Sequence, residues 1–242
     1  MTLADGMLIN TWENLEPQSL HALRNNEILR SMVKNKPVYT VGPITKIYQP
    51  VGLKSEVIEW LDEQPERSVI YVSFGSGGTL SSEQITELAW GLALSQQRFV
   101  WVVRPPAGHI KDGSFFESGH SGGDFEPRID WGFLTHCGWN SMLESIGSWV
   151  AMIAWVLYAE KRMNATMLTE ELKVAVRPEV LPTKKVVGRE EVEKMVKCLI
   201  EGEEGKAIRK KVKKLKEGVE EAMSLNGSSY ISTYKFVEDC WS

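Results

Sequence analysis

The segment 136–144 reads His-Cys-Gly-Trp-Asn-Ser-Met-Leu-Glu and concentrates polar side chains around a glycine. An apolar run precedes it and a helical pattern begins near residue 140, which places His136 in a turn from a strand into a helix. Asn140 and Ser141 then lie at the helix N-terminus, where backbone N–H groups and the helix dipole favour a phosphate. His136 can donate a further hydrogen bond. Glu144, one turn after Asn140, can accept hydrogen bonds from a ribose diol.

These residue types at this spacing predict a nucleotide site. Taken one at a time, these residues also have a structural interpretation without a ligand. Asn140 or Ser141 can cap the helix, and His136 can be a structural histidine. The combination of all of them in one turn favours the nucleotide.

A second loop, Phe74-Gly-Ser-Gly-Gly78, also suits an anion. Its small residues let the backbone approach a ligand, and Ser76 offers a hydroxyl at the end of a predicted strand, where parallel α/β folds bind ligands. A tight glycine turn without a ligand has the same composition. The loop is no P-loop, because it lacks Gly-Lys-Ser/Thr, and its spacing does not match Gly-x-Gly-x-x-Gly.

Strands and helices alternate around these loops. Apolar runs predict strands at 68–74, 99–103, 131–135 and 150–154, and helical periodicity predicts helices at 81–94, 140–147, 160–172, 189–200 and 203–223. Ser81 and Gln84 form a capping-box pattern. The run 99–103 is almost wholly apolar, which predicts a strand covered on both faces. The alternation predicts an α/β fold with a doubly wound parallel sheet.

Two stretches lack this pattern. Residues 104–130 are rich in Gly, Ser, Pro and His and read as irregular. Residues 1–50 contain a short helix after Pro17, but the proline and glycine at 37–43 predict an extended connector more than a packed unit.

Composition excludes several classes. The chain has 242 residues and a formal net charge of −4, and this charge disfavours nucleic-acid binding. Its three cysteines are too few for a disulfide framework or a zinc cluster. No secretory signal or membrane-length apolar run is present, so we expect a cytoplasmic protein without membrane insertion. The lysines at 210–216 alternate with apolar residues and lie among glutamates, which indicates a solvated helix face.

Several of these segments together resemble the plant secondary-product glycosyltransferase signature, the nucleotide-sugar site of plant UDP-dependent glycosyltransferases. They are 132–141, 143–145, 153–155, 157–160 and 163–165, with further landmarks in order at 8–16, 41–43, 60–62, 69–76 and 227–229. Within the family, 41–43 and 104–106 are most similar to enzymes that glucosylate phenolics, including the anthocyanidin 3-O-glucosyltransferases.

The resemblance implies the GT-B arrangement of two Rossmann-like halves. Residues 51–242 would be the C-terminal half, which binds the UDP-sugar, and residues 1–50 an inter-domain linker with a remnant of the N-terminal half. The diphosphate would be held by Ser76, His136, Asn140 and Ser141. Further contacts would come from Trp139 at the same turn, Glu144 on the ribose, Ala159 beside the acceptor, Glu160 on the sugar hydroxyls, and Lys161 in the place of the signature's final glutamine.

The family's general base is a histidine of the N-terminal half, and His21, His109 and His120 do not match it. No catalytic residue is therefore assigned, and the chain alone is expected to be inactive. The resemblance implies UDP-glucose as donor, a flavonoid or other phenol as acceptor, and no metal or other cofactor.

Four features depart from the family pattern, and one of them is the replacement of two prolines by Ala151 and Val156, which removes two local restraints on the chain. The Trp-Ala-Pro-Gln opening of the signature is absent, and Trp131 belongs to the predicted strand instead. An ammonium at Lys161 only donates hydrogen bonds, whereas an amide also accepts them, which leaves the identity of the sugar open. Trp149 replaces a glycine that ends a helix, where a left-handed residue is common. An inactive UDP-binding fragment or pseudoenzyme is therefore the alternative function.

Overall fold

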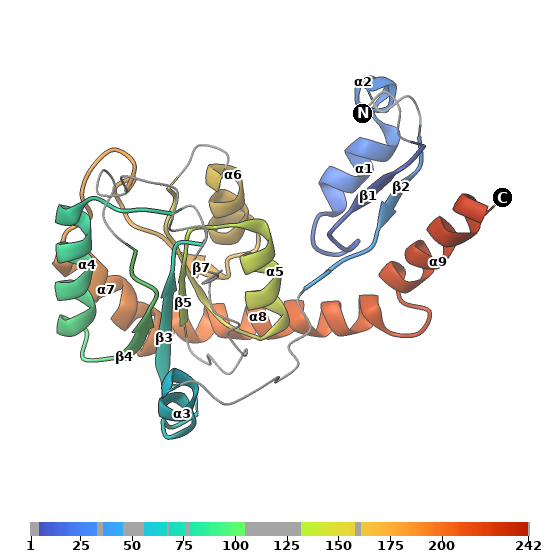
Figure 1. The fold of residues 1–242 in the computed structure, drawn as a ribbon. Helices are drawn as coiled ribbons and strands as arrows, with labels where there is room; N and C mark the ends of the chain where they lie inside the picture. Colours follow the sequence, from blue (N-terminus) through green and yellow to red (C-terminus); the bar gives the residue numbers. More distant parts are fainter. Residues whose placement is uncertain are drawn as a thin grey trace. The chain divides into compact units, whose positions relative to one another are not determined.

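The computed structural model describes residues 5–32, 36–45, 56–66, 68–75, 78–104, 132–157 and 161–241 (Figure 1). Internal contacts divide the chain into two compact units, Met1–Lys46 with Lys214–Ser242, and Ile47–Lys213. The sequence-based division placed 51–242 in one domain, whereas the contacts group residues 214–242 with the N-terminal segment.

The larger unit contains a five-stranded sheet in the order β4-β3-β5-β6-β7, and all neighbouring strands are parallel. The strands are β3 (Val69–Ser73), β4 (Arg98–Trp101), β5 (Gly132–Thr135), β6 (Met152–Ala154) and β7 (Ala175–Val176). The predicted α/β fold with a parallel sheet is confirmed. The two-residue strand β7 was not predicted, because it is too short to show a period.

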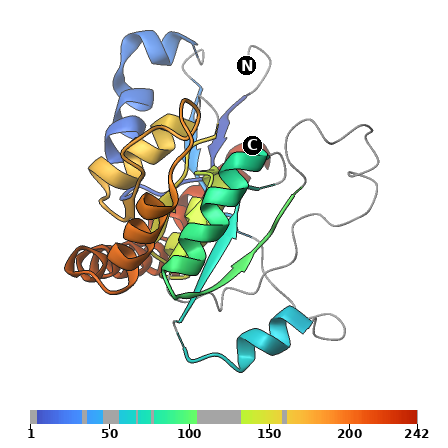
Figure 2. The ribbon, with the colours of Figure 1, turned by 90° about the vertical axis from the view of Figure 1, so that its left-hand side faces the viewer.

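Helices cover both faces of this sheet. The helices of this unit are α3 (Glu56–Asp62), α4 (Ser82–Leu94), α5 (Trp139–Gly147), α6 (Lys161–Thr166) with its π-helical continuation η2 (Met167–Glu171), α7 (Arg189–Ile200) and α8 (Glu203–Met223), which continues into the smaller unit. Figures 1 and 2 show α4 and α7 side by side on one face and α5 on the other. In the capping box, the Ser81 hydroxyl accepts the N–H of Gln84, while the Gln84 amide instead pairs with the backbone of Val187.

The chain path explains why α4 and α5 lie on opposite faces. From β3 the chain crosses through α4 to β4 on one side, and from β5 it crosses through α5 to β6 on the other side. Because such crossovers are right-handed, opposite directions place the helices on opposite faces. Open α/β sheets bind ligands at such a reversal, in the crevice outside the carboxyl ends of the two strands, which here are β3 and β5.

The middle strands form the core of this unit. Ile70, Val72, Leu134, Met152 and Ile153 are fully buried, as expected of parallel strands covered by helices. Strand β4 departs from this expectation: it is the edge strand, and Phe99 is 36% exposed. The prediction that 99–103 is covered on both faces is therefore wrong, because apolar content alone does not distinguish an edge strand from a central one.

The end of α5 adopts the left-handed conformation expected there. Trp149 has a φ of 60°, a region that disfavours residues with a side chain. Its indole N–H donates to the carbonyl oxygen of Arg209 at 3.0 Å, and the Lys213 ammonium lies 5.5 Å from its ring centroid. These contacts tie the strained position to α8.

The smaller unit contains a parallel pair of strands, β1 (Met7–Ile9) and β2 (Val38–Thr40), with helices α1 (Pro17–Asn25), α2 (Glu27–Met32) and α9 (Ser228–Trp241). Trp12, Leu15 and Leu20 are buried, so the prediction of an unpacked connector is wrong for the described part of residues 1–50. Hydrogen bonds join the first and last parts of the chain. The Tyr39 hydroxyl donates to Asp239 at 2.5 Å, and the Ser229 hydroxyl donates to the Gly42 carbonyl at 2.5 Å.

The solvated face predicted for the lysine-rich helix agrees with the burial pattern of α8. Ile208 and Val212 are buried, whereas Lys210, Lys211 and Lys214 are exposed. Across the described residues, no helix has the length and apolar character needed to span a membrane.

Candidate functional site

The loops that follow β3 and β5 meet at the imidazole of His136. Gly75, which directly follows the loop's first residue, has a φ of 69°, and a Cβ placed on it would lie 2.6 Å from Nε2 of His136. A Cβ on Gly138 would lie 2.5 Å from the same atom. Both distances are shorter than real side chains tolerate, so glycine at these two positions makes room for the ring. The two loops named from the sequence are thus brought together at the crevice between β3 and β5.

His136 is neutral in this environment. The residue is only 8% exposed, and burial lowers its pKa to about 4, with a smaller contribution from the ammonium of Lys161. Nδ1 is buried and has no hydrogen-bond partner in the described part of the chain. A buried N–H without a partner is less favourable than a buried lone pair, so we assign the proton to Nε2. His136 then offers one N–H donor without a positive charge.

The turn between β5 and α5 is held from two sides. Cys137 adopts a φ of 63°, its N–H donates to the Thr135 hydroxyl at 3.2 Å, and its carbonyl oxygen accepts from the Asn164 amide at 2.9 Å. Burial raises the pKa of the Cys137 thiol to about 12, so the thiol is protonated and does not act as a nucleophile. The turn therefore has a fixed backbone conformation.

Helix α5 begins without a side-chain cap. Its N-cap residue is Gly138, and no acidic residue lies in the first turn. The alternative in which Asn140 or Ser141 caps the helix is therefore wrong. Both residues, with Trp139, lie in the first turn, and Asn140 is exposed. This is the arrangement in which a helix N-terminus binds an anion.

Glu144 lies one turn further along α5, on the exposed side. Its negative charge contributes to raising the pKa of Tyr71, which burial raises most. Tyr71 lies on β3 and stacks on Phe133 of β5, with ring centroids 5.1 Å apart. Glu144 is thus near the crevice between the two strands, as a residue that contacts the ribose would need to be.

Lys161 is the first residue of α6 and lies near the same turn, since its charge lowers the pKa values of both His136 and Cys137. Three predicted site residues, Ser76, Ala159 and Glu160, lie outside the described residues, and so does Trp131.

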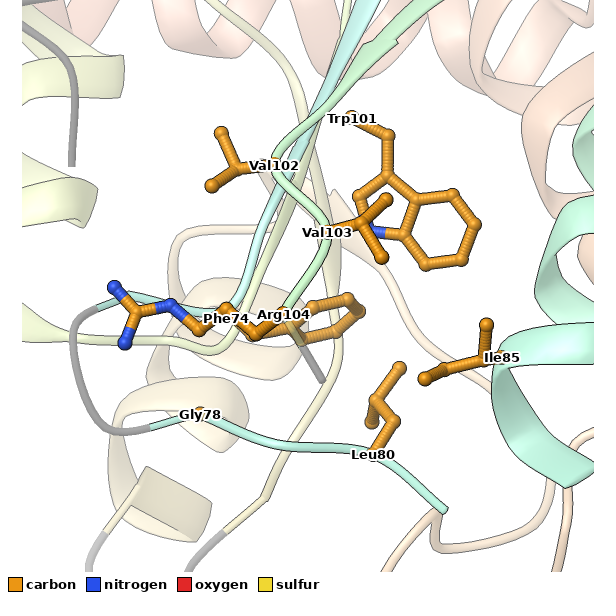
Figure 3. A pocket seen from close by; sticks show the side chains of 8 residues that line it. All are labelled: Phe74, Gly78, Leu80, Ile85, Trp101, Val102, Val103 and Arg104. Carbon is orange, nitrogen blue, oxygen red and sulfur yellow. The ribbon is translucent and has the colours of Figure 1, made fainter. Parts of the chain in front are cut away.

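A small hollow lies beside this crevice, at the ends of β3 and β4 (Figure 3). It is lined by Phe74, Gly78, Leu80, Ile85, Trp101, Val102, Val103 and Arg104, and its volume is about 10 Å³. This is space for one water molecule and not for a nucleotide base. In Figure 3, the Arg104 guanidinium points away from Trp101 and Ile85. Within the described ranges, no group of three or more His, Cys, Asp or Glu side chains is placed to hold a metal ion.

Three positioning residues were not assigned a role from the sequence. Gly75 was noted only as part of a loop of small residues, and Thr135 and Asn164 only as parts of the signature. Their roles depend on contacts between elements, and the contact of Asn164 with Cys137 joins residues 27 positions apart.

The chain is similar in sequence to known proteins. The sequence model of the family "UDP-glucoronosyl and UDP-glucosyl transferase" matches residues 125–216. Anthocyanidin 3-O-glucosyltransferase 5 of Manihot esculenta is 48% identical in a match that covers 94% of this chain and 52% of the relative.

Two solved structures are also similar to this chain. The crystal structure of TcCGT1 in complex with UDP superposes with a TM-score of 0.88 at 45% identity, and the match covers 98% of this chain and 56% of that one. The structure of Phytolacca americana UGT2 with UDP-2fluoro-glucose and pterostilbene gives a TM-score of 0.82 at 39% identity, covering 99% and 54%. The chain therefore spans about half the length of the curated relatives that it matches.

Proposed function

We propose that this chain, which is a homologue of the plant UDP-dependent glycosyltransferases, binds UDP-glucose and supplies the donor-binding half of an enzyme that glucosylates a phenolic hydroxyl. One observation carries the proposal: the uncapped N-terminus of α5 and the neutral imidazole of His136 converge at the crevice between β3 and β5. Asn140 and Ser141 in the first turn of α5 complete a set of donors suited to a diphosphate.

These donors would act on the leaving group. As the acceptor oxygen forms a bond to the anomeric carbon, the bond from that carbon to the β-phosphate oxygen breaks and its electron pair remains on UDP. Fixed donors lower the barrier because they stabilise this growing charge without having to reorganise. The acceptor proton must pass to a base, and the residues assigned to the donor site in this chain do not include one.

The choice of substrates is supported by two relatives. One is named for the glucosylation of an anthocyanidin, and the other was solved with a fluorinated UDP-glucose and the phenol pterostilbene. We propose UDP-glucose and a flavonoid or related phenol as the substrates of this chain, without a metal ion. In this proposal Glu144 contacts the ribose and Ala159 lies beside the acceptor. The other residues that contact the donor would be Ser76, Trp139 and Glu160.

A second candidate is UDP binding without turnover. The chain spans about half of its relatives, and Lys161 replaces the glutamine of the signature. In this role the chain would bind the nucleotide without transferring its sugar.

Calorimetric titration of the 242-residue chain with UDP, in the presence of EDTA, tests the shared part of both candidates. We expect saturable binding that is lost in an Asn140→Ala, Ser141→Ala double variant, whereas Ser224→Ala, at an exposed serine distant in sequence from the site, binds as the wild type does. Absence of binding by a folded wild-type chain would overturn both candidates.

The transferase proposal is then separated from simple binding by a chimera. The chain is joined to the first half of the Manihot relative and incubated with UDP-glucose and a phenolic acceptor. Formation of a glucoside supports the enzyme, and tight UDP binding without any glycoside supports the second candidate.

A further inference from the structure

Lys161 is placed where a positive charge does not stabilise its own helix. It is the first residue of α6, Arg162 follows it, and the first turn holds no acidic residue. A cation there meets the positive end of the helix dipole, which is unfavourable. By contrast, α3, α4, α7 and α8 of the same unit each carry a glutamate in the first turn. The dipole of α6 therefore does not explain the lysine.

Contacts of α6 show what Lys161 lies beside. Asn164 is three residues further along, on the same face of the helix, and its amide binds the carbonyl oxygen of Cys137 at 2.9 Å. This face of α6 is thus directed at the turn that leads into α5. The ammonium is close enough to this turn to lower the pKa values of both His136 and Cys137.

The charges around this turn favour an anion. The N-terminus of α5 begins at Gly138 without an acidic residue in its first turn, and the buried His136 carries no charge at neutral pH. Glu144, the described carboxylate on α5, lies a turn further along the helix. The ammonium of Lys161 and the dipole of α5 therefore act on the same space with the same sign.

We propose that Lys161 contacts the diphosphate of the bound nucleotide sugar and acts as a cationic clamp on the leaving group. This inference rests on the proposed donor site and changes the part that Lys161 plays in it: the glutamine of the family signature contacts sugar hydroxyls, whereas a lysine here holds phosphate. Lys161 transfers no proton in this role. Its charge offsets the electron pair that the broken glycosidic bond leaves on the β-phosphate oxygen.

Binding of four ligands to the full chain tests the clamp: uridine, UMP, UDP and UDP-glucuronate, each measured by calorimetry at two salt concentrations. We expect Lys161→Gln to weaken UDP binding roughly five- to tenfold, to leave uridine binding unchanged, and to reduce the dependence of UDP affinity on salt. Lys161→Arg should retain most of the affinity. Arg162→Gln, one residue away on an exposed position of the same helix, is the matched control and should bind UDP as the wild type does.

Other results would overturn the clamp. Equal UDP affinity in Lys161→Gln and wild type shows that the ammonium does not contact the diphosphate. An equal loss for uridine and UDP shows that Lys161 acts on the fold or on the nucleoside. A loss seen for UDP-glucuronate but not for UDP assigns the ammonium to the sugar. If the wild-type chain does not bind UDP at all, the proposed donor site itself fails, and this is a separate result from unchanged binding in the variant.

Discussion

The side-chain amide of Asn164 donates a hydrogen bond to the carbonyl oxygen of Cys137 at 2.9 Å, so a residue of α6 fixes the turn at which α5 begins. Cys137 needs this support because its φ of 63° is unfavourable for a residue with a side chain. The N-terminal end of α5 is therefore positioned by the next helix along the chain as well as by its own strand.

Replacement of Asn164 tests this support. Asn164→Ala removes the partner of the Cys137 carbonyl, and we expect the free energy of unfolding to fall by about 1 kcal/mol and UDP binding to weaken. Urea unfolding and calorimetry measure the two effects. Met163→Ala is the control, because Met163 is 79% exposed on the same helix. Unchanged UDP affinity in Asn164→Ala would show that the turn holds its shape unaided.

The glycines around His136 provide a second test. In Gly138→Ala, which has an ordinary φ of −67°, the new methyl group meets the imidazole, and we expect a loss of about 1–3 kcal/mol in unfolding free energy together with weaker UDP binding. Gly75→Ala adds backbone strain to the same clash. Gly147→Ala has no atom within 4 Å of the new Cβ and should be neutral or slightly stabilising. Three similar unfolding midpoints would contradict the close contact.

Stability should fall as the pH falls from 6.5 toward 4. The pKa of His136 is about 4 in the folded chain, chiefly because of burial, whereas an unfolded histidine titrates near its ordinary value of 6.5. The unfolded state therefore binds the proton first, and stabilisation present at pH 7 is lost in this interval, on the order of 2–3 kcal/mol by pH 4.5.

The measurement is a series of urea unfolding curves between pH 7 and pH 5. This range avoids Glu87, whose pKa the hydrogen bonds from Arg189 lower to about 2, so that its contribution changes only below its ordinary value of 4.5. In His136→Asn the difference between pH 7 and pH 5 should be much smaller. An equal slope in the variant and the wild type would assign the pH dependence to other groups.

At Trp149, backbone strain lowers the stability of the folded chain, whereas the contacts of the side chain raise it. Trp149→Gly relieves about 1 kcal/mol of left-handed strain but removes the hydrogen bond to Arg209, the cation–π contact with Lys213 and the packing of the ring, so we expect a net loss of about 1–2 kcal/mol. Trp149→Phe keeps an aromatic ring but loses the indole N–H that donates to Arg209, and it should cost about 1 kcal/mol or less. Thermal melts of both variants decide the question, since a higher midpoint for Trp149→Gly would mean that strain outweighs the contacts.

The sequence predicted most of the sheet and its helices, because each buried element carries its own local pattern. Helices α7 and α8 have the bounds expected from their periodicity, and Ser81 caps α4 as predicted. Helix α9 was not predicted: its run of β-branched and aromatic residues from Tyr230 is typical of strands, and several of these side chains are exposed on the helix.

In the candidate site, too, features within one segment were predictable from the sequence, whereas contacts between distant segments were not. His136, Asn140 and Ser141 were identified because one turn contains all three. The approach of Gly75 to His136 joins residues from two loops, and it follows only from the placement of β5 beside β3. The neutral state of His136 likewise depends on burial by residues far apart in the chain, which no local pattern shows.

The hydrogen bond from Ser229 to the Gly42 carbonyl sets an order of events during synthesis of the protein. These residues are 187 positions apart, so at ribosomal rates of about 5–20 residues per second Gly42 emerges roughly 10–40 s before its partner is made. During this interval the parallel pair β1 and β2 lacks its contacts with α9, because α9 has not yet been synthesised. The residues of the five-stranded sheet are synthesised in the same period. Slow steps in translation between residues 213 and 228 would therefore lengthen the time for which the smaller unit is open to chaperones and proteases, and leave the larger unit unaffected.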